Sequence, residues 1–108
     1  RRKRKGRTPY YPLSEVRLRI RVGKVQFTGT ALSCAWEDFA WGKKEVLEAV
    51  MSLKLRHFYK TEECKVYPGQ MVDYYKAKKL KGENVYTHFY IDITTDNLII
   101  QSFKKLEE

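Results

Sequence analysis

The chain has 108 residues, and its 22 Lys and Arg against 13 Asp and Glu give a formal net charge of +9. This length predicts one domain with a modest core, without room for a separate cofactor-binding module. No run approaches the roughly 20 apolar residues that span a bilayer, and no signal-peptide pattern is present, so we expect a soluble cytoplasmic protein. The basic charge favours an anionic partner, with nucleic acid ahead of an acidic protein or a membrane surface.

The first part of the chain predicts a basic tail followed by helices. Residues 1–12 form the expected flexible tail, which leaves a single domain over residues 13–108. The first helix is expected over 14–23, with Ser14 as its N-cap and Gly23 as its stop.

Residues 24–30 indicate a linker or a brief extended piece. Thr30 is the candidate N-cap of a second helix over 30–41. A third helix over 42–53 carries an apolar stripe at helical spacing, which we expect to be core rather than a binding surface.

After Leu53 the pattern changes to alternating polar and β-forming residues, which predict strands at 56–63, 71–80, 84–92 and 97–105. The connections are too short for parallel crossovers, so the strands should form an antiparallel meander. Helices first and strands after indicate an α+β fold, with the N-terminal helices on one face of a four-stranded antiparallel sheet. The other face should be partly open and is the expected place for a site.

The last hairpin, Asn84 to Lys105, places polar residues among apolar ones. A three-residue loop over 94–96 would pair Tyr86 with Lys104 and His88 with Ser102 on one face. The opposite face would then hold Phe89, Ile91, Ile99, Gln101 and Phe103. A loop of two or four residues would separate Tyr86 from Lys104, because a one-residue slip inverts the faces.

A phenol, an imidazole and an ammonium group on one face fit phosphodiester chemistry. A lysine can stabilise the charge of a phosphorane, and Tyr86 or His88 can move protons as general base or acid. RNA supplies its own 2′-OH nucleophile, and Cys34 and Cys64 lack metal-binding spacing, so we expect no metal and no cofactor. A structural role for each side chain is the competing interpretation.

The order of the motifs resembles the MqsR-type toxins of bacterial toxin–antitoxin systems, within the RelE-like ribonucleases. The similarity lies in "LSEVRLRIRVGKVQFTGTAL", "FYK", "MVDYYKA", "VYTHFYID" and "LIIQSFKK", from about Leu13 to Lys105. It implies helices against a small antiparallel sheet, an mRNA-cleaving activity, and a cognate antitoxin, which we expect to be a helix-turn-helix protein.

The resemblance also implies site residues. The family's lysine after "FY", its strand tyrosine and its final lysine correspond to Lys60, Tyr86 and Lys104. Val72 occupies the place of a family glutamine, which would alter specificity, weaken activity or give His88 a larger share. The role of His88 is inferred from the hairpin alone.

We therefore predict a metal-independent endoribonuclease toxin with catalytic residues Lys60, Tyr86, His88 and Lys104. Two further sets should bind RNA: Arg56, Lys76, Lys78 and Lys79 on flanking phosphates, and Tyr74, Tyr75 and Tyr90 on splayed bases. The alternatives are a non-catalytic RNA- or DNA-binding module, and a decayed toxin that keeps only antitoxin binding. The basic first helix, with Arg17, Arg19 and Arg21, is a candidate surface for an acidic partner.

Overall fold

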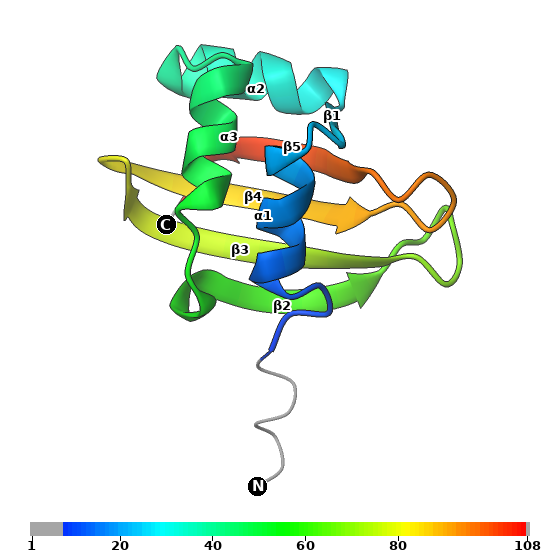
Figure 1. Cartoon of the computed structure of the whole chain (residues 1–108). Helices are drawn as coiled ribbons and strands as arrows, with labels where there is room; N and C mark the ends of the chain where they lie inside the picture. The colour runs from blue at the N-terminus through cyan, green and yellow to red at the C-terminus, as the bar shows by residue number, and fades with distance from the viewer. Residues whose placement is uncertain (1–7, 108) are drawn as a thin grey trace, which may run out of the picture.

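The computed structural model describes residues 8–107, so the basic stretch 1–7 lies outside the described residues. The elements in chain order are α1 (Leu13–Arg21), β1 (Val25–Phe27), α2 (Gly29–Phe39), α3 (Lys43–Met51), the 3-10 helix η2 (Leu55–His57), β2 (Phe58–Glu63), β3 (Met71–Leu80), β4 (Glu83–Ile91) and β5 (Leu98–Lys105). Figure 1 shows α1 and α3 lying across one face of the sheet, with α2 at its β5 side. The expected α+β class is confirmed.

The sheet has five strands in the order β1-β5-β4-β3-β2, and it is mixed rather than purely antiparallel. The additional strand is β1, which pairs in parallel with β5 within the stretch we expected to be a linker or brief extended piece. A three-residue strand is too short to show an alternating pattern. Its existence depends on the free edge of β5, which is distant in sequence.

The helix ends differ from the prediction in their caps. Helix α1 begins after Pro12 rather than at Ser14, and proline fits there because its missing N–H would have no helical partner. Helix α2 begins after Thr28 rather than Thr30, and the Thr28 hydroxyl accepts a 3.1 Å hydrogen bond from the Ala31 N–H. Gly23 does end the first helix as predicted, in a left-handed conformation with φ of 79°.

The core lies between the helices and the sheet. The predicted stripe of the third helix is confirmed, because Val46, Val50 and Leu53 are fully or almost fully buried. From the sheet side the core receives Tyr75, Phe89, Ile91, Leu98, Ile100 and Phe103. The face of the sheet opposite α1 and α3 is here called the open face. It carries the half-buried and exposed side chains that alternate with the core-facing ones along β3, β4 and β5.

The hairpin between β4 and β5 confirms the predicted pairs Tyr86–Lys104 and His88–Ser102, but for a different reason. The loop has four residues, not three, since Asp92 pairs with Asn97 through a 2.9 Å backbone hydrogen bond. A β-bulge then shifts the register between His88 and Phe89, so Gln101 is an extra residue of β5.

The bulge also corrects the faces predicted for the loop end of the hairpin. Phe89 pairs with Ile100 and Tyr90 with Ile99, so Ile100, not Ile99, belongs to the buried face. Gln101, predicted to lie opposite Phe89 in the core, instead contacts His88 on the open face.

Candidate active site

The predicted catalytic residues lie in two adjacent rows that run across the open face. The first row joins Lys60, Tyr74, His88 and Ser102, one residue from each of β2 to β5. The second joins Lys76, Tyr86 and Lys104 from β3 to β5. Neighbours within a row are about 5 Å apart, and the rows are separated by about 7 Å along the strands, so both can contact one nucleotide.

Tyr74 stands at the centre of the first row and connects three predicted catalytic side chains. Its ring lies 4.5 Å from the imidazole of His88 and 6.4 Å from the ring of Tyr86, between ring centroids. The Lys60 Nζ lies 4.9 Å from the Tyr74 centroid on the other side. These contacts hold the catalytic candidates as one cluster.

Tyr86 and His88 occupy environments that favour their neutral forms. Burial raises the pKa of Tyr86, and the neighbouring Tyr74 adds to this increase, so the phenol keeps its proton at neutral pH. Burial also lowers the pKa of His88, and Lys104 and Lys60 lower it further, although the hydrogen bond that His88 donates to Gln101 opposes the change. A protonated phenol and a neutral imidazole are suited to opposite roles in proton transfer.

Three lysines lie in the two rows of the open face, and two of them adjoin Tyr86. The Lys104 Nζ lies 5.5 Å from the Tyr86 ring centroid, and Lys76 lines the same hollow of about 230 Å³ as Tyr86 and Lys104. Lys60 donates a 2.7 Å hydrogen bond to Glu62, which raises the pKa of Lys60. The cluster is therefore cationic and matches an anionic ligand.

Two residues of this surface were missed by the sequence analysis. Tyr59 is exposed, and its ring contacts the Nζ of Lys76 at 3.9 Å and that of Lys60 at 5.4 Å. It reaches the open face beside Lys60 because the register of β2 shifts between Phe58 and Lys60. Glu62 pairs with Lys60, and their alternation along β2 was the signal that could have identified it.

Tyr75 is a correction to the predicted RNA-binding set. It is fully buried on the core side of β3, where its ring stacks on Phe89 at 5.2 Å. It cannot stack on a base, since alternation along β3 directs it away from its neighbour Tyr74.

The remaining predicted RNA-binding residues lie outside the two rows. Tyr90 lies two residues after His88 on β4. Together with Tyr67 it lines a cavity of about 420 Å³. Lys78 and Lys79 are exposed near the end of β3, whereas Arg56 lies in η2, outside the strand predicted for it.

A family model described as "Motility quorum-sensing regulator, toxin of MqsA" matches residues 8–105. The chain belongs to this toxin family. The resemblance inferred from the motifs is thus confirmed, and the protein is the toxin of a toxin–antitoxin system with an MqsA-type antitoxin as its partner. No curated protein matches the chain.

The position that the resemblance matches to a family glutamine holds a buried side chain in this toxin. Val72 is 2% exposed. The nearby Gln70 does not supply an amide to the rows, because its Nε2 donates to the Ile91 carbonyl at 3.0 Å and its Oε1 accepts from the Ile93 N–H at 3.2 Å. Gln70 therefore fixes the end of the sheet.

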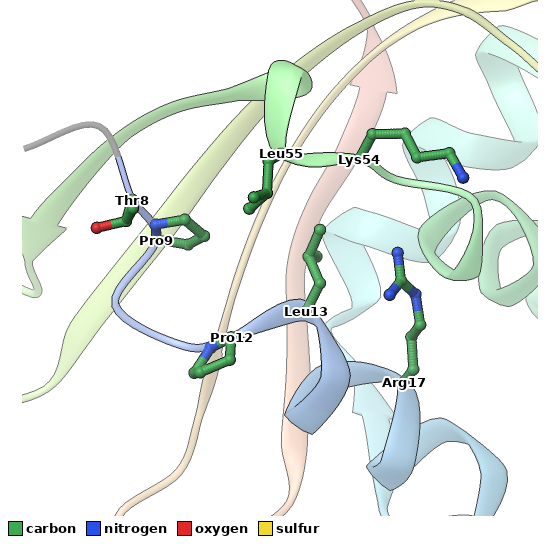
Figure 2. Close-up of a pocket in the computed structure, with 7 residues that line it drawn as sticks. All are labelled: Thr8, Pro9, Pro12, Leu13, Arg17, Lys54 and Leu55. Carbon is green, nitrogen blue, oxygen red and sulfur yellow. The ribbon is translucent and has the colours of Figure 1, made fainter. Parts of the chain in front are cut away.

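The helical side of the toxin carries a separate cavity of about 600 Å³, where Pro9, Leu13 and Leu55 come together from different segments (Figure 2). Arg17, on its rim, donates to the Met51 and Leu53 carbonyls. Arg19 forms ion pairs with Glu15 and Asp96. Two of the three arginines considered for an acidic partner are thus already bound within the chain.

Within residues 8–107, no cluster of three or more His, Cys, Asp and Glu side chains could hold a metal ion. No helix in the same part of the chain is long and apolar enough to cross a membrane.

Proposed function

We propose that this toxin is a metal-independent endoribonuclease that cuts mRNA through attack of the 2′-OH on the adjacent phosphorus. The observation that carries the proposal is the pair of adjacent rows, which bring a phenol, an imidazole and three ammonium groups together on the open face. The family assignment supports a toxin. The reaction needs no metal, because RNA supplies the nucleophile and lysines supply the positive charge.

In the proposed step, the Nε2 atom of His88 accepts the proton of the 2′-OH while the 2′-oxygen forms a bond to phosphorus. The bond from phosphorus to the 5′-oxygen breaks, and the phenol of Tyr86 donates its proton to that oxygen. Lys60 and Lys104 stabilise the negative charge on the non-bridging oxygens. The products are a 2′,3′-cyclic phosphate and a 5′-hydroxyl, after which Tyr86 regains a proton from water and His88 loses one to it.

The pKa shifts support one of the two possible assignments of base and acid. A neutral imidazole can accept a proton at pH 7, whereas a phenol with a raised pKa is a poor base and remains protonated. We therefore assign His88 as the base and Tyr86 as the acid.

Cleavage should persist when divalent metals are removed. Purified toxin incubated with mRNA in excess EDTA should yield fragments that end in 2′,3′-cyclic phosphate and 5′-hydroxyl groups. Lys60→Ala and Lys104→Ala should each lower the rate by about 10²- to 10³-fold, since each removes charge stabilisation at the phosphorane. Gel analysis of end-labelled RNA measures both results.

Intact RNA at high toxin excess, with binding retained, would contradict the proposal and favour a non-catalytic binding module. Induced expression in bacteria separates a decayed toxin from an active one. We expect growth arrest, and we expect co-expression of the cognate antitoxin to relieve it. Unaffected growth would contradict an active toxin.

Lys76 should contribute to RNA affinity through one phosphate contact. Lys76→Ala should weaken binding of a non-cleavable 2′-O-methyl RNA and reduce the slope of log K against log salt concentration by about 0.7 to 0.9, one released counterion. Lys44→Ala, a matched exposed lysine on α3, should leave both unchanged. Fluorescence anisotropy at several salt concentrations measures the slope, and equal slopes for the two variants would exclude the contact.

A further inference from the structure

Gln101 contacts the proposed base but was not part of the predicted site. We propose that Gln101 is a positioning residue that fixes the imidazole of His88 in the tautomer with Nε2 free to accept a proton. This inference rests on the proposed function for the role of His88. It adds to that function the residue and the hydrogen bond that select the tautomer of His88.

The bulge in β5 brings Gln101 to the open face. As the extra residue of β5, it leaves the core-facing alternation and reaches the side chain of His88. Its backbone is held from the other side of the strand, because the Thr28 hydroxyl donates a 2.9 Å hydrogen bond to the Gln101 carbonyl. Thr28 is also the N-cap of α2, so the position of Gln101 is tied to a helix end.

The hydrogen bond between the two side chains determines where the imidazole carries its proton. Nδ1 of His88 lies 2.9 Å from Oε1 of Gln101. An amide oxygen only accepts hydrogen bonds, so Nδ1 must carry the hydrogen, and in the neutral ring Nε2 is then the atom with a free lone pair.

Nε2 is also accessible. It makes no hydrogen bond within the described part of the chain. Among the described residues, the Tyr75 hydroxyl is the only buried side-chain polar atom without a partner. Nε2 is therefore not fully enclosed by the protein, and we expect a 2′-OH to approach it from the open face.

Neighbouring rings restrain the plane of the imidazole. Tyr74 lies at 4.5 Å with an interplanar angle of 32°, and Tyr86 meets the ring edge-on at 5.8 Å and 73°. The rings limit rotation of His88, while Gln101 selects between its two nitrogens. Together they keep Nε2 available on the same face as the Tyr86 phenol.

His57 provides an internal reference with the opposite tautomer. Its Nδ1 accepts a 3.0 Å hydrogen bond from the Lys54 N–H, so its neutral ring carries the proton on Nε2. The chain has 2 histidines, so both can be followed in one nitrogen NMR spectrum. Their tautomers should appear as reversed patterns of ring nitrogen shifts.

The first experiment measures ring nitrogen shifts of the full chain by two-bond proton–nitrogen correlation at neutral to mildly basic pH. In the unsubstituted protein, His88 should be protonated at Nδ1 and His57 at Nε2. Gln101→Leu, which keeps the size but removes the acceptor, should shift His88 toward the Nε2–H form. Gln26→Leu, an exposed glutamine of β1, is the matched control and should change neither histidine.

The second experiment measures RNA cleavage as a function of pH. Gln101→Leu should lower kcat by about 10- to 100-fold with little change in KM, because a misplaced base affects the transition state. The charged and titratable groups that face His88 are Lys60, Tyr74, Tyr86 and Lys104, and they are unchanged in these variants.

The pH profile distinguishes positioning from a structural role. Gln101→Leu loses a hydrogen bond that favours the imidazolium, so the acidic limb of kcat should move to lower pH. Gln101→Glu places a carboxylate beside His88, so the same limb should move to higher pH. A merely structural role would move neither limb.

Two results would overturn the inference: a proton on Nε2 of His88 in the unsubstituted protein, or an unchanged tautomer and kcat in Gln101→Leu. If none of the proteins cuts RNA although the tautomers behave as expected, the proposed function fails. The hydrogen bond then stands without the catalytic role assigned to it.

Discussion

Replacing Tyr86 with phenylalanine should lower the rate of RNA cleavage by about 10²- to 10⁴-fold, the range for loss of a general acid. The phenol is placed between Lys76 and Lys104 in its row, and burial raises its pKa so that it keeps the proton it must donate. Single-turnover cleavage of a short RNA with one site measures the loss. Binding of a non-cleavable RNA should change little, since the ring remains.

Tyr10→Phe is the matched control, because Tyr10 is 59% exposed on the N-terminal segment and lies outside both rows. It should cleave at the unsubstituted rate. If the cleavage rate of Tyr86→Phe lay within about threefold of this control, Tyr86 would not be the general acid. The acid would then be solvent or His88. An RNA whose 5′-oxygen is replaced by sulfur needs no acid, and it should restore most of the lost rate.

Asp73→Ala should lower the free energy of unfolding by about 3 kcal/mol, because it leaves buried donors without partners. Asp73 is fully buried, and its carboxylate accepts from the Tyr10 N–H at 3.0 Å, the Tyr11 N–H at 2.9 Å and the Thr61 hydroxyl. Burial raises the pKa of Asp73, while these donors oppose the increase. Urea denaturation followed by tryptophan fluorescence measures the change.

Asp73→Asn keeps the size and one acceptor oxygen, so its loss should be smaller than that of Asp73→Ala. Glu37→Ala, an exposed acidic residue on α2, should change stability by less than about 0.5 kcal/mol. A loss below about 1 kcal/mol in Asp73→Ala would show that the segment before α1 contributes little to the fold.

The sequence predicted most of the elements because their signals are local. The apolar stripe of α3 and the alternation of β3 to β5 each lie within one segment, and Gly23 is a local stop. The pairing of β1 with β5 escaped prediction because the two strands lie more than 70 positions apart. Thr28 was passed over because Thr30 is an equally good cap by residue type, and only the contacts of the Thr28 hydroxyl with the Ala31 N–H and the Gln101 carbonyl distinguish the two.

The predicted pairs of the candidate site agree with the structure because two errors, in the loop length and in the missing bulge, cancel. The predicted three-residue loop and the observed four-residue loop with a bulge give the same pairs at Tyr86 and His88, but not at Ile99 and Ile100. Tyr75 was placed with its neighbour Tyr74 because composition does not distinguish the faces of β3. Gln101 was assigned to the core because a bulge leaves no mark in the alternation of side chains.

The loop length and the bulge in β5 together determine which side chains of the hairpin face the same side of the sheet. A loop with an even number of residues and one extra strand residue place Tyr86 and Lys104 on the same side, as an odd loop without the bulge would. Deleting Gln101 alone should leave a regular hairpin, because Ile100 and Ser102 already pair with Phe89 and His88 and keep these partners. Tyr86 should still face Lys104, and only the side-chain partner of His88 should be lost. The extra residue of β5 thus adds one side chain to the open face without moving either row.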